Sequence, residues 1–246
     1  MKVGWPQELY LVRHAQSAGN VARDLAHAAG AAVIEITSRD CDVPLSPLGE
    51  RQAAALGQWC ARQLEPLDVV LSSPYVRAQE TAAIALRAAG WDGVSITLDE
   101  RLREKEFGQL DRLTRAGIEA KFPEQAELRR VLGKFYYRPP GGESWTDVIL
   151  RLRSVAETLR HECAGQRVAI VTHQVIVLCF RYLFEHLTES ELLAIDRAGD
   201  VANCSVTSYR FGAGGPAELT SYNAVAPMQE AGAPVTATPD VPVARG

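Results

Sequence analysis

The sequence predicts an α/β fold of three layers, α/β/α, in which helices cover both faces of a mixed, mostly parallel sheet. Three observations favour this fold. Short runs rich in Val, Ile and Leu recur along the chain and have the length of buried strands. Amphipathic helical patterns separate them, as parallel neighbours require. Two further strand-like runs near the C-terminal end have no helix between them, which favours an antiparallel pair there.

Four runs are expected as buried strands, and they cover residues 8–12, 68–72, 94–98 and 167–172. The late pair covers 205–211 and 218–224. The main helices are expected at about 47–64, 74–89, 144–163, 174–186 and 190–197. Ser46 is a suitable N-cap before Pro47, and Ser144 with Asp147 has the spacing of a capping box.

Three segments interrupt this alternation. Residues 21–43 form a long connection with an Ala-rich helical start and a strand-like patch at 33–36. Residues 101–138 contain a loop and two expected helices, at 114–122 and 125–137. Insertions of this length often form pocket walls. Residues 227–246, rich in Ala, Pro, Val and Thr, are expected to be a flexible tail, which leaves one domain over 1–226.

Composition limits the kinds of partner. The chain has 246 residues, 47% of them hydrophobic, and a net charge of −4, which argues against a broad nucleic-acid-binding face. Neither a signal peptide nor a membrane span is apparent, so we expect no membrane partner. The five cysteines are odd in number and lack Cys-x-x-Cys spacing. Reduced thiols and a cytoplasmic location are therefore expected, with Cys204 buried rather than reactive.

Charged side chains follow three of the predicted strands. Arg13 and His14 follow the first strand, Arg77 lies in the first helical turn after the second, and His173 with Gln174 follows the strand at 167–172. If these strands are parallel neighbours, both histidines and both arginines meet at one edge of the sheet. Helix N-termini there add N–H donors. This arrangement predicts a pocket for a dianion such as phosphate, which the arginine fork suits.

The same residues suggest a reaction. Nearby arginines favour the neutral form of a histidine, and a neutral imidazole is a competent nucleophile toward phosphorus. The leaving oxygen of a phosphate ester also needs a proton, and Glu104 or Glu106 can supply it. Lys105 is expected on a solvated face, although contact with a second anionic group of the substrate stays open. No metal-ligand spacing is present, so no metal or cofactor is expected.

Six segments, taken together, resemble the histidine phosphatase superfamily, which is also called phosphoglycerate mutase-like. The resemblance covers about residues 8–225, and its segments are 13–20 (Arg-His-Ala-Gln-Ser-Ala-Gly-Asn), 44–53, 72–82, 102–108, 141–144 and 171–174. Gly-Gly-Glu-Ser at 141–144 and His-Gln at 173–174 are closest to the fructose-2,6-bisphosphatase-like branch. Ala15 replaces the usual Gly, a mild change if its φ is negative.

The resemblance implies a role for each matching residue. His14 accepts the phosphoryl group, and Arg13, Arg77 and His173 stabilise its charge. Glu104 protonates the leaving alcohol and then activates water. Three further residues are implied to hold the phosphate, namely Asn20, Gln174 and, with the alternative of simply capping a helix, Ser17.

Three functions stay open at this point. The acid loop, residues 102–108, lacks the sequence typical of true phosphoglycerate mutases. This favours a metal-independent phosphatase acting on a small phosphate monoester. A mutase using the same pocket is the second reading, and a non-catalytic phosphate-binding regulatory module is the third. Family relatives are often homodimers, but the sequence determines neither the oligomeric state nor the ester.

Overall fold

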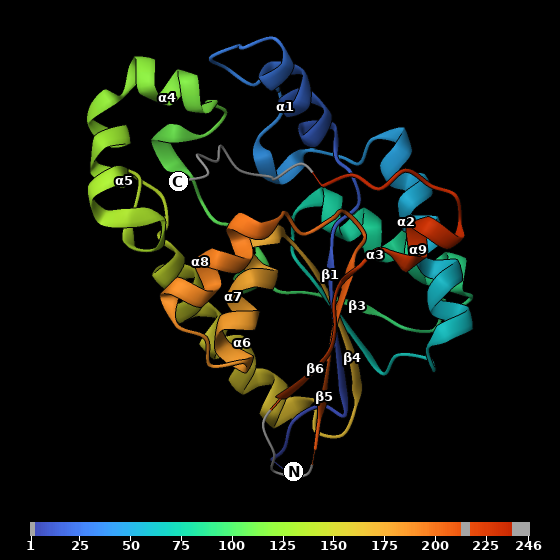
Figure 1. Cartoon of the computed structure of the whole chain (residues 1–246). Helices are drawn as coiled ribbons and strands as arrows, with labels where there is room; N and C mark the ends of the chain where they lie inside the picture. Colours follow the sequence, from blue (N-terminus) through green and yellow to red (C-terminus); the bar gives the residue numbers. More distant parts are fainter. Residues whose placement is uncertain (1–2, 213–216, 238–246) are drawn as a thin grey trace.

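The computed structural model describes residues 3–212 and 217–237, and its centre is one six-stranded sheet (Figure 1). The strand order is β3-β2-β4-β1-β5-β6. The strands are β1 (Glu8–Arg13), β2 (Val69–Ser72), β3 (Ile96–Leu98), β4 (Arg167–Thr172), β5 (Val206–Phe211) and β6 (Ala217–Ala224). β1, β2, β3 and β4 are parallel to one another. β5 is antiparallel to β1, and β6 is antiparallel to β5. The predicted mixed, mostly parallel sheet is confirmed.

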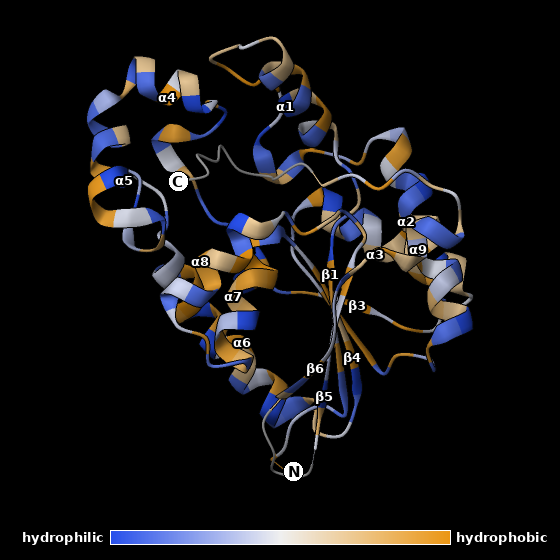
Figure 2. Cartoon of the chain, in the orientation of Figure 1, coloured by the Kyte–Doolittle hydropathy of each residue, from blue (hydrophilic) through white to orange (hydrophobic). Residues whose placement is uncertain are grey.

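Helices cover both faces of this sheet, so the predicted three layers are confirmed as well. One layer contains α2 (Pro47–Gln63), α3 (Val76–Ala89) and the short α9 (Ala226–Glu230). The other contains α6 (Trp145–Glu162), α7 (Gln174–Phe184) and α8 (Glu189–Ala198). Successive strand residues point to opposite faces. Leu9 and Leu11 accordingly join the core under α6 and α7, while Tyr10 and Val12 join the core under α2 and α3. The centres of β1, β2 and β4 are correspondingly hydrophobic, whereas β5 and β6 carry many polar residues (Figure 2).

The predicted helix starts hold to within two residues. Ser46 accepts a hydrogen bond from the Gly49 N–H at 3.0 Å, and Pro47 is the first residue of α2. Ser144 and Asp147 form the capping box of α6. α3 begins at Val76 rather than at residue 74, because Tyr75 is still in an extended conformation as its N-cap.

The two insertions lie beyond the end of β1 (Figure 1). In the first, α1 (Ala18–Ala28) begins earlier than predicted, a single bridge from Val33 to Leu113 replaces the strand-like patch, and η1 (Asp40–Asp42) follows. The second contains η2 (Glu100–Leu102), η3 (Gly108–Leu110), α4 (Arg115–Lys121) and α5 (Pro123–Tyr136). Both predicted helices of that insertion are present.

The structure corrects the start of the predicted tail. Residues 226–230 form α9, which packs against α2, and Met228 is completely buried. The chain then continues to Thr236, whose carbonyl accepts a hydrogen bond from the Asn203 N–H at 2.8 Å. Composition missed this because two buried side chains, Pro227 and Met228, and a few hydrogen bonds fix the segment. Residues 238–246 of that tail lie outside the described residues.

Candidate active site

The two predicted histidines meet at the end of neighbouring strands. Arg13, the last residue of β1, is paired with Thr172, the last residue of β4, so His14 and His173 leave the sheet at the same level. Their ring centroids are 5.1 Å apart at an interplanar angle of 61°, and both side chains are fully buried. The parallel register of β1 and β4 therefore produces the convergence that the strand ends predicted.

The contact of His14 with the backbone assigns a role to each ring nitrogen. Its Nδ1 lies 2.7 Å from the carbonyl oxygen of Ala15. Because a carbonyl only accepts, Nδ1 must carry the proton, and in the neutral ring Nε2 then holds the lone pair. Ala15 is not among the residues with positive φ, so the exchange of Gly for Ala at this position is mild, as expected.

A short loop holds His14, and its backbone is committed to the protein itself. Each N–H from Arg13 to Ser17 donates to an acceptor elsewhere in the chain. These acceptors are, in order, Ser205 O, Thr172 O, Thr81 Oγ1, Gln52 Oε1 and Asn20 Oδ1. α2 also packs tightly on the loop, since a Cβ on Gly49 would lie 2.0 Å from the Gln16 carbonyl oxygen. The loop is therefore a rigid support rather than an anion-binding nest.

Both predicted arginines are buried. Arg13 donates from Nη1 to the carbonyl of Val201. Arg77 lies in the first turn of α3 and contacts Asp40 of η1, an acidic partner that the sequence did not suggest. Its Nη1 and Nη2 each lie 3.1 Å from a carboxylate oxygen of Asp40, and Nη1 also donates to the Asp40 carbonyl at 2.6 Å. The first insertion thus places a carboxylate beside an arginine predicted to bind phosphate.

His173 is positioned by the turn between β2 and α3. Its Nε2 lies 2.8 Å from Ser73 Oγ, and the Tyr75 ring is 5.1 Å from the His173 ring, centroid to centroid. Tyr75 also lies under the Arg77 guanidinium, 4.9 Å from its Cζ. Ser73 and Tyr75 were not predicted as site residues. Both belong to the segment that resembled the family, so their position in that motif was the available signal.

The acid loop distinguishes Glu104 from Glu106. Glu104 is 1% exposed, and its Oε1 accepts the Lys105 N–H at 2.7 Å. Two residues earlier, the Leu102 carbonyl accepts from Thr172 Oγ1 at 2.8 Å, which brings this loop to the end of β4. Glu106 is exposed and accepts the N–H groups of the next two residues. The geometry therefore favours Glu104 as the acid.

The three predicted phosphate-binding residues occupy two helix starts. Ser17 is the N-cap of α1 and forms a capping box with Asn20, as the alternative reading of Ser17 proposed. Gln174 is the first residue of α7, so its N–H points out of the helix N-terminus, where an anion is favoured. Its side-chain Nε2 donates to Asp200 Oδ1 at 3.0 Å. Phosphate binding by all three stays a prediction.

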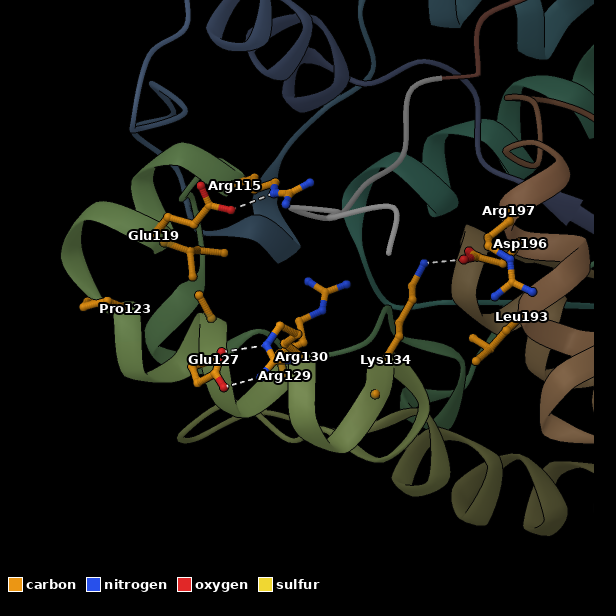
Figure 3. A pocket seen from close by; sticks show the side chains of 13 residues that line it. Arg115, Glu119, Pro123, Glu127, Arg129, Arg130, Lys134, Leu193, Asp196 and Arg197 are labelled. Atoms are coloured by element: carbon orange, nitrogen blue, oxygen red, sulfur yellow. Dashed lines mark hydrogen bonds and ion pairs between the residues drawn. The ribbon is translucent and has the colours of Figure 1, made fainter.

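A larger space opens between the second insertion and α8. A cavity of about 660 Å³ lies between α4–α5 and α8, where Lys134 reaches across to Asp196 at 2.5 Å (Figure 3). A smaller cavity, lined by Lys105 and Gln174 among others, shares Arg129, Lys134 and Asp196 with it. We call the two together the side cavity. Its smaller part, of about 30 Å³, lies against Gln174 and Lys105, and its larger part is lined by residues of α4, α5 and α8.

Lys105 lines the side cavity instead of a solvated face, so that expectation was wrong. It is 7% exposed and forms no ion pair with the described residues; its Nζ lies 4.1 Å from the centroid of the Phe107 ring. Burial, together with Arg129, lowers the pKa of Lys105 from 10.5 to about 8. A buried ammonium that forms no ion pair within the described part of the chain is suited to an anionic ligand.

The described residues, 3–212 and 217–237, contain neither a candidate metal cluster nor a candidate membrane span. Within them, no group of three or more His, Cys, Asp or Glu side chains is arranged to hold a metal ion. No helix there is long and apolar enough to cross a membrane. Cys204 is fully buried, and burial raises the pKa of its thiol well above the ordinary value, which agrees with the predicted burial.

Comparison with known proteins agrees with the motifs. A family model described as the histidine phosphatase superfamily (branch 1) matches residues 9–224. A 2,3-bisphosphoglycerate-dependent phosphoglycerate mutase of Gloeobacter violaceus is 30% identical over 192 residues, which cover 76% of this chain and 80% of that protein. A 6-phosphofructo-2-kinase/fructose-2,6-bisphosphatase of Caenorhabditis elegans is 30% identical over 194 residues, 78% of this chain and 37% of that protein. Among solved structures, a mycobacterial glucosyl-3-phosphoglycerate phosphatase in complex with VO3 has a TM-score of 0.68 at 26% identity, covering 89% of this chain and all of that one (100%).

Proposed function

This chain belongs to the histidine phosphatase superfamily, branch 1, and we propose that it hydrolyses a phosphate monoester through a phosphohistidine at His14. The observation that carries the proposal is the buried pair of His14 and His173, with ring centroids 5.1 Å apart and Nδ1 of His14 tied to a carbonyl. This arrangement supports a nucleophilic Nε2 facing a cationic pocket.

The reaction has two halves. In the first, the His14 Nε2 lone pair attacks phosphorus, the ester P–O bond breaks, and Glu104 gives its proton to the leaving oxygen. Arg13, Arg77 and His173 stabilise the charge on the transferring oxygens. In the second, the Glu104 carboxylate takes a proton from water, the hydroxide attacks phosphorus, and the N–P bond breaks to release orthophosphate.

The side cavity supports a leaving group that carries a second anionic group. Lys105 stands next to the proposed acid and forms no ion pair with the described residues, and Arg129 lines the same space. The phosphatase with the TM-score of 0.68 is named for such an ester, since a phosphoglycerate carries a carboxylate. We therefore propose that Lys105 binds a carboxylate or phosphate at the far end of the substrate.

The test is phosphate release from p-nitrophenyl phosphate and 3-phosphoglycerate in EDTA. We expect turnover by the wild-type chain, none by His14→Ala, and normal turnover by His161→Ala, a matched histidine that is 56% exposed on α6. After a rapid quench, acid-labile and base-stable label on His14 identifies the intermediate. Phosphate binding without turnover between pH 5 and 8 would instead identify a binding module.

Phosphoryl transfer to a second hydroxyl is the other candidate, because the mutase of Gloeobacter violaceus is 30% identical to this chain. A mutase would interconvert 2- and 3-phosphoglycerate faster than it releases orthophosphate. Product analysis by ³¹P NMR, with and without 2,3-bisphosphoglycerate, measures both rates in one sample. Interconversion in excess of release would replace hydrolysis by transfer.

A further inference from the structure

We propose that Thr236, in the segment after α9, is a positioning residue for the loop that carries His14, and that it acts by orienting the side-chain amides of Gln52 and Asn203. This role goes beyond the proposed function, and only one of the two readouts below, kcat, depends on that function. Thr236 is the point at which the C-terminal segment reaches the rigid loop, through two separate chains of hydrogen bonds.

The first chain of hydrogen bonds runs through Asn203, which is fully buried just before β5. Its Nδ2 donates to the His14 carbonyl at 3.0 Å and lies 3.5 Å from Asn20 Oδ1. Its Oδ1 accepts from the Thr236 hydroxyl at 2.9 Å, and its backbone N–H donates to the Thr236 carbonyl at 2.8 Å. Asn203 therefore connects Thr236 directly to the backbone of the proposed nucleophile.

The second chain runs through Gln52, which is fully buried on α2. Its Oε1 accepts the Gln16 N–H at 2.9 Å, two residues after the His14 carbonyl that Asn203 contacts. Its Nε2 donates to Thr236 Oγ1 at 3.0 Å and to the Pro234 carbonyl at 2.9 Å. One hydroxyl thus contacts both amides that hold the loop.

The requirements of the two amides are opposite, and a hydroxyl can meet both. An amide can rotate by half a turn and exchange its oxygen and nitrogen at little steric cost. The loop needs a donor from Asn203, for the His14 carbonyl, and an acceptor from Gln52, for the Gln16 N–H. The Thr236 hydroxyl gives its single proton to Asn203 and accepts one from Gln52, so each amide is held in the orientation that the loop needs.

The segment that carries Thr236 is itself anchored. Met228 of α9 is fully buried in the core under α2, and the Ala233 N–H donates to the Met228 carbonyl at 2.9 Å. Pro234 and Val235 then lead to Thr236, which is half-buried. An apolar anchor and a polar tip together allow a C-terminal segment to support a loop that lies more than two hundred residues earlier in the chain.

The experiment compares Thr236→Val, which keeps the shape and removes the hydroxyl, with Thr236→Ser, which keeps the hydroxyl. We expect kcat on an alkyl phosphate to fall about tenfold in T236V, with KM unchanged within about twofold, because small displacements of a reacting group are costly. T236S restores kcat. The matched control is Thr220→Val on β6, which removes an exposed hydroxyl that pairs with Ser208 and should change neither constant.

A second readout does not depend on turnover. The ¹⁵N shifts of the His14 ring report which nitrogen carries the proton, and we expect a mixed population in T236V but a pure Nδ1–H form in the wild type, T236S and T220V. Unchanged kcat and unchanged ring shifts in folded T236V, or a T236S variant as impaired as T236V, would overturn the proposal. If the wild-type chain hydrolyses no ester, the proposed function fails, and the ring shifts alone decide the positioning role.

Discussion

Lys105→Met should convert the side cavity from one that prefers an anion to one that is indifferent to it. The informative substrates are 3-phosphoglycerate and glycerol 3-phosphate, which share the esterified carbon and the neighbouring hydroxyl and differ only in a carboxylate. Lys105 is 7% exposed, and a hydrogen bond to a charged group is worth about 1.5–3 kcal/mol. At about 1.4 kcal/mol per factor of ten, kcat/KM on 3-phosphoglycerate should fall roughly 10- to 100-fold relative to glycerol 3-phosphate.

The same lysine predicts a pH dependence of the same ratio. The pKa of Lys105 is lowered to about 8, so in the free protein the side chain is a charged ammonium below about pH 8 and a neutral amine above it. The preference for the carboxylate should therefore be constant up to about pH 7 and fall about tenfold by pH 9, since kcat/KM reports the free enzyme. K105M should show the low ratio at every pH.

Phosphate release at substrate concentrations far below KM gives kcat/KM for both esters. Lys121→Met, which removes an exposed lysine at the end of α4, controls for net charge and should leave the ratio unchanged. If K105M slowed both esters by the same factor, Lys105 would act on the reaction centre and not on the carboxylate. That result would refute the proposed anion site.

Three further outcomes are expected. Glu104→Gln should lower kcat on an alkyl phosphate about 10²- to 10⁴-fold, and less on p-nitrophenyl phosphate, whose leaving group needs little protonation. Glu106→Gln, at an exposed residue, should lower kcat less than about twofold. The reverse order would assign the acid role to Glu106. Asp40→Asn removes the charge beside Arg77, so the inhibition constant of orthophosphate should fall about fivefold, and an unchanged constant would mean that this carboxylate does not compete with phosphate. Met228→Ala should lower the free energy of unfolding by about 2–4 kcal/mol in urea titrations, and a loss below about 0.5 kcal/mol would show that α9 does not stay docked in solution.

The sequence predicted the parts of the site that local patterns encode. His14 and His173 could be placed because each follows a short apolar run, and the parallel order of those runs brings their ends together. The burial of Glu104 could not be read from its neighbours, since the four successive charged residues at 103–106 look like a solvated loop. Its resemblance to a family motif identified it instead.

Other features depend on contacts between distant segments, which leave no local pattern. Asp40 meets Arg77 across 37 positions, and Thr236 meets Gln52 across 184. Lys105 was misplaced because a lysine is usually exposed, and only the packing of the second insertion around it makes it an exception. Composition likewise suggested a tail after residue 226, where the buried Pro227 and Met228 dock the chain.

The commitment of every N–H between Arg13 and Ser17 to the protein itself has a consequence for divergence among related enzymes. Since that backbone offers nothing to an incoming ester, recognition of the ester is delegated to side chains carried by other elements, above all by the two insertions. Apart from Asp40 and Glu104, which contact or form the proposed reaction centre, mutations in those insertions can accumulate without deforming it. A lineage with this architecture can therefore acquire a new substrate by remodelling the walls alone, while inheriting its chemistry intact.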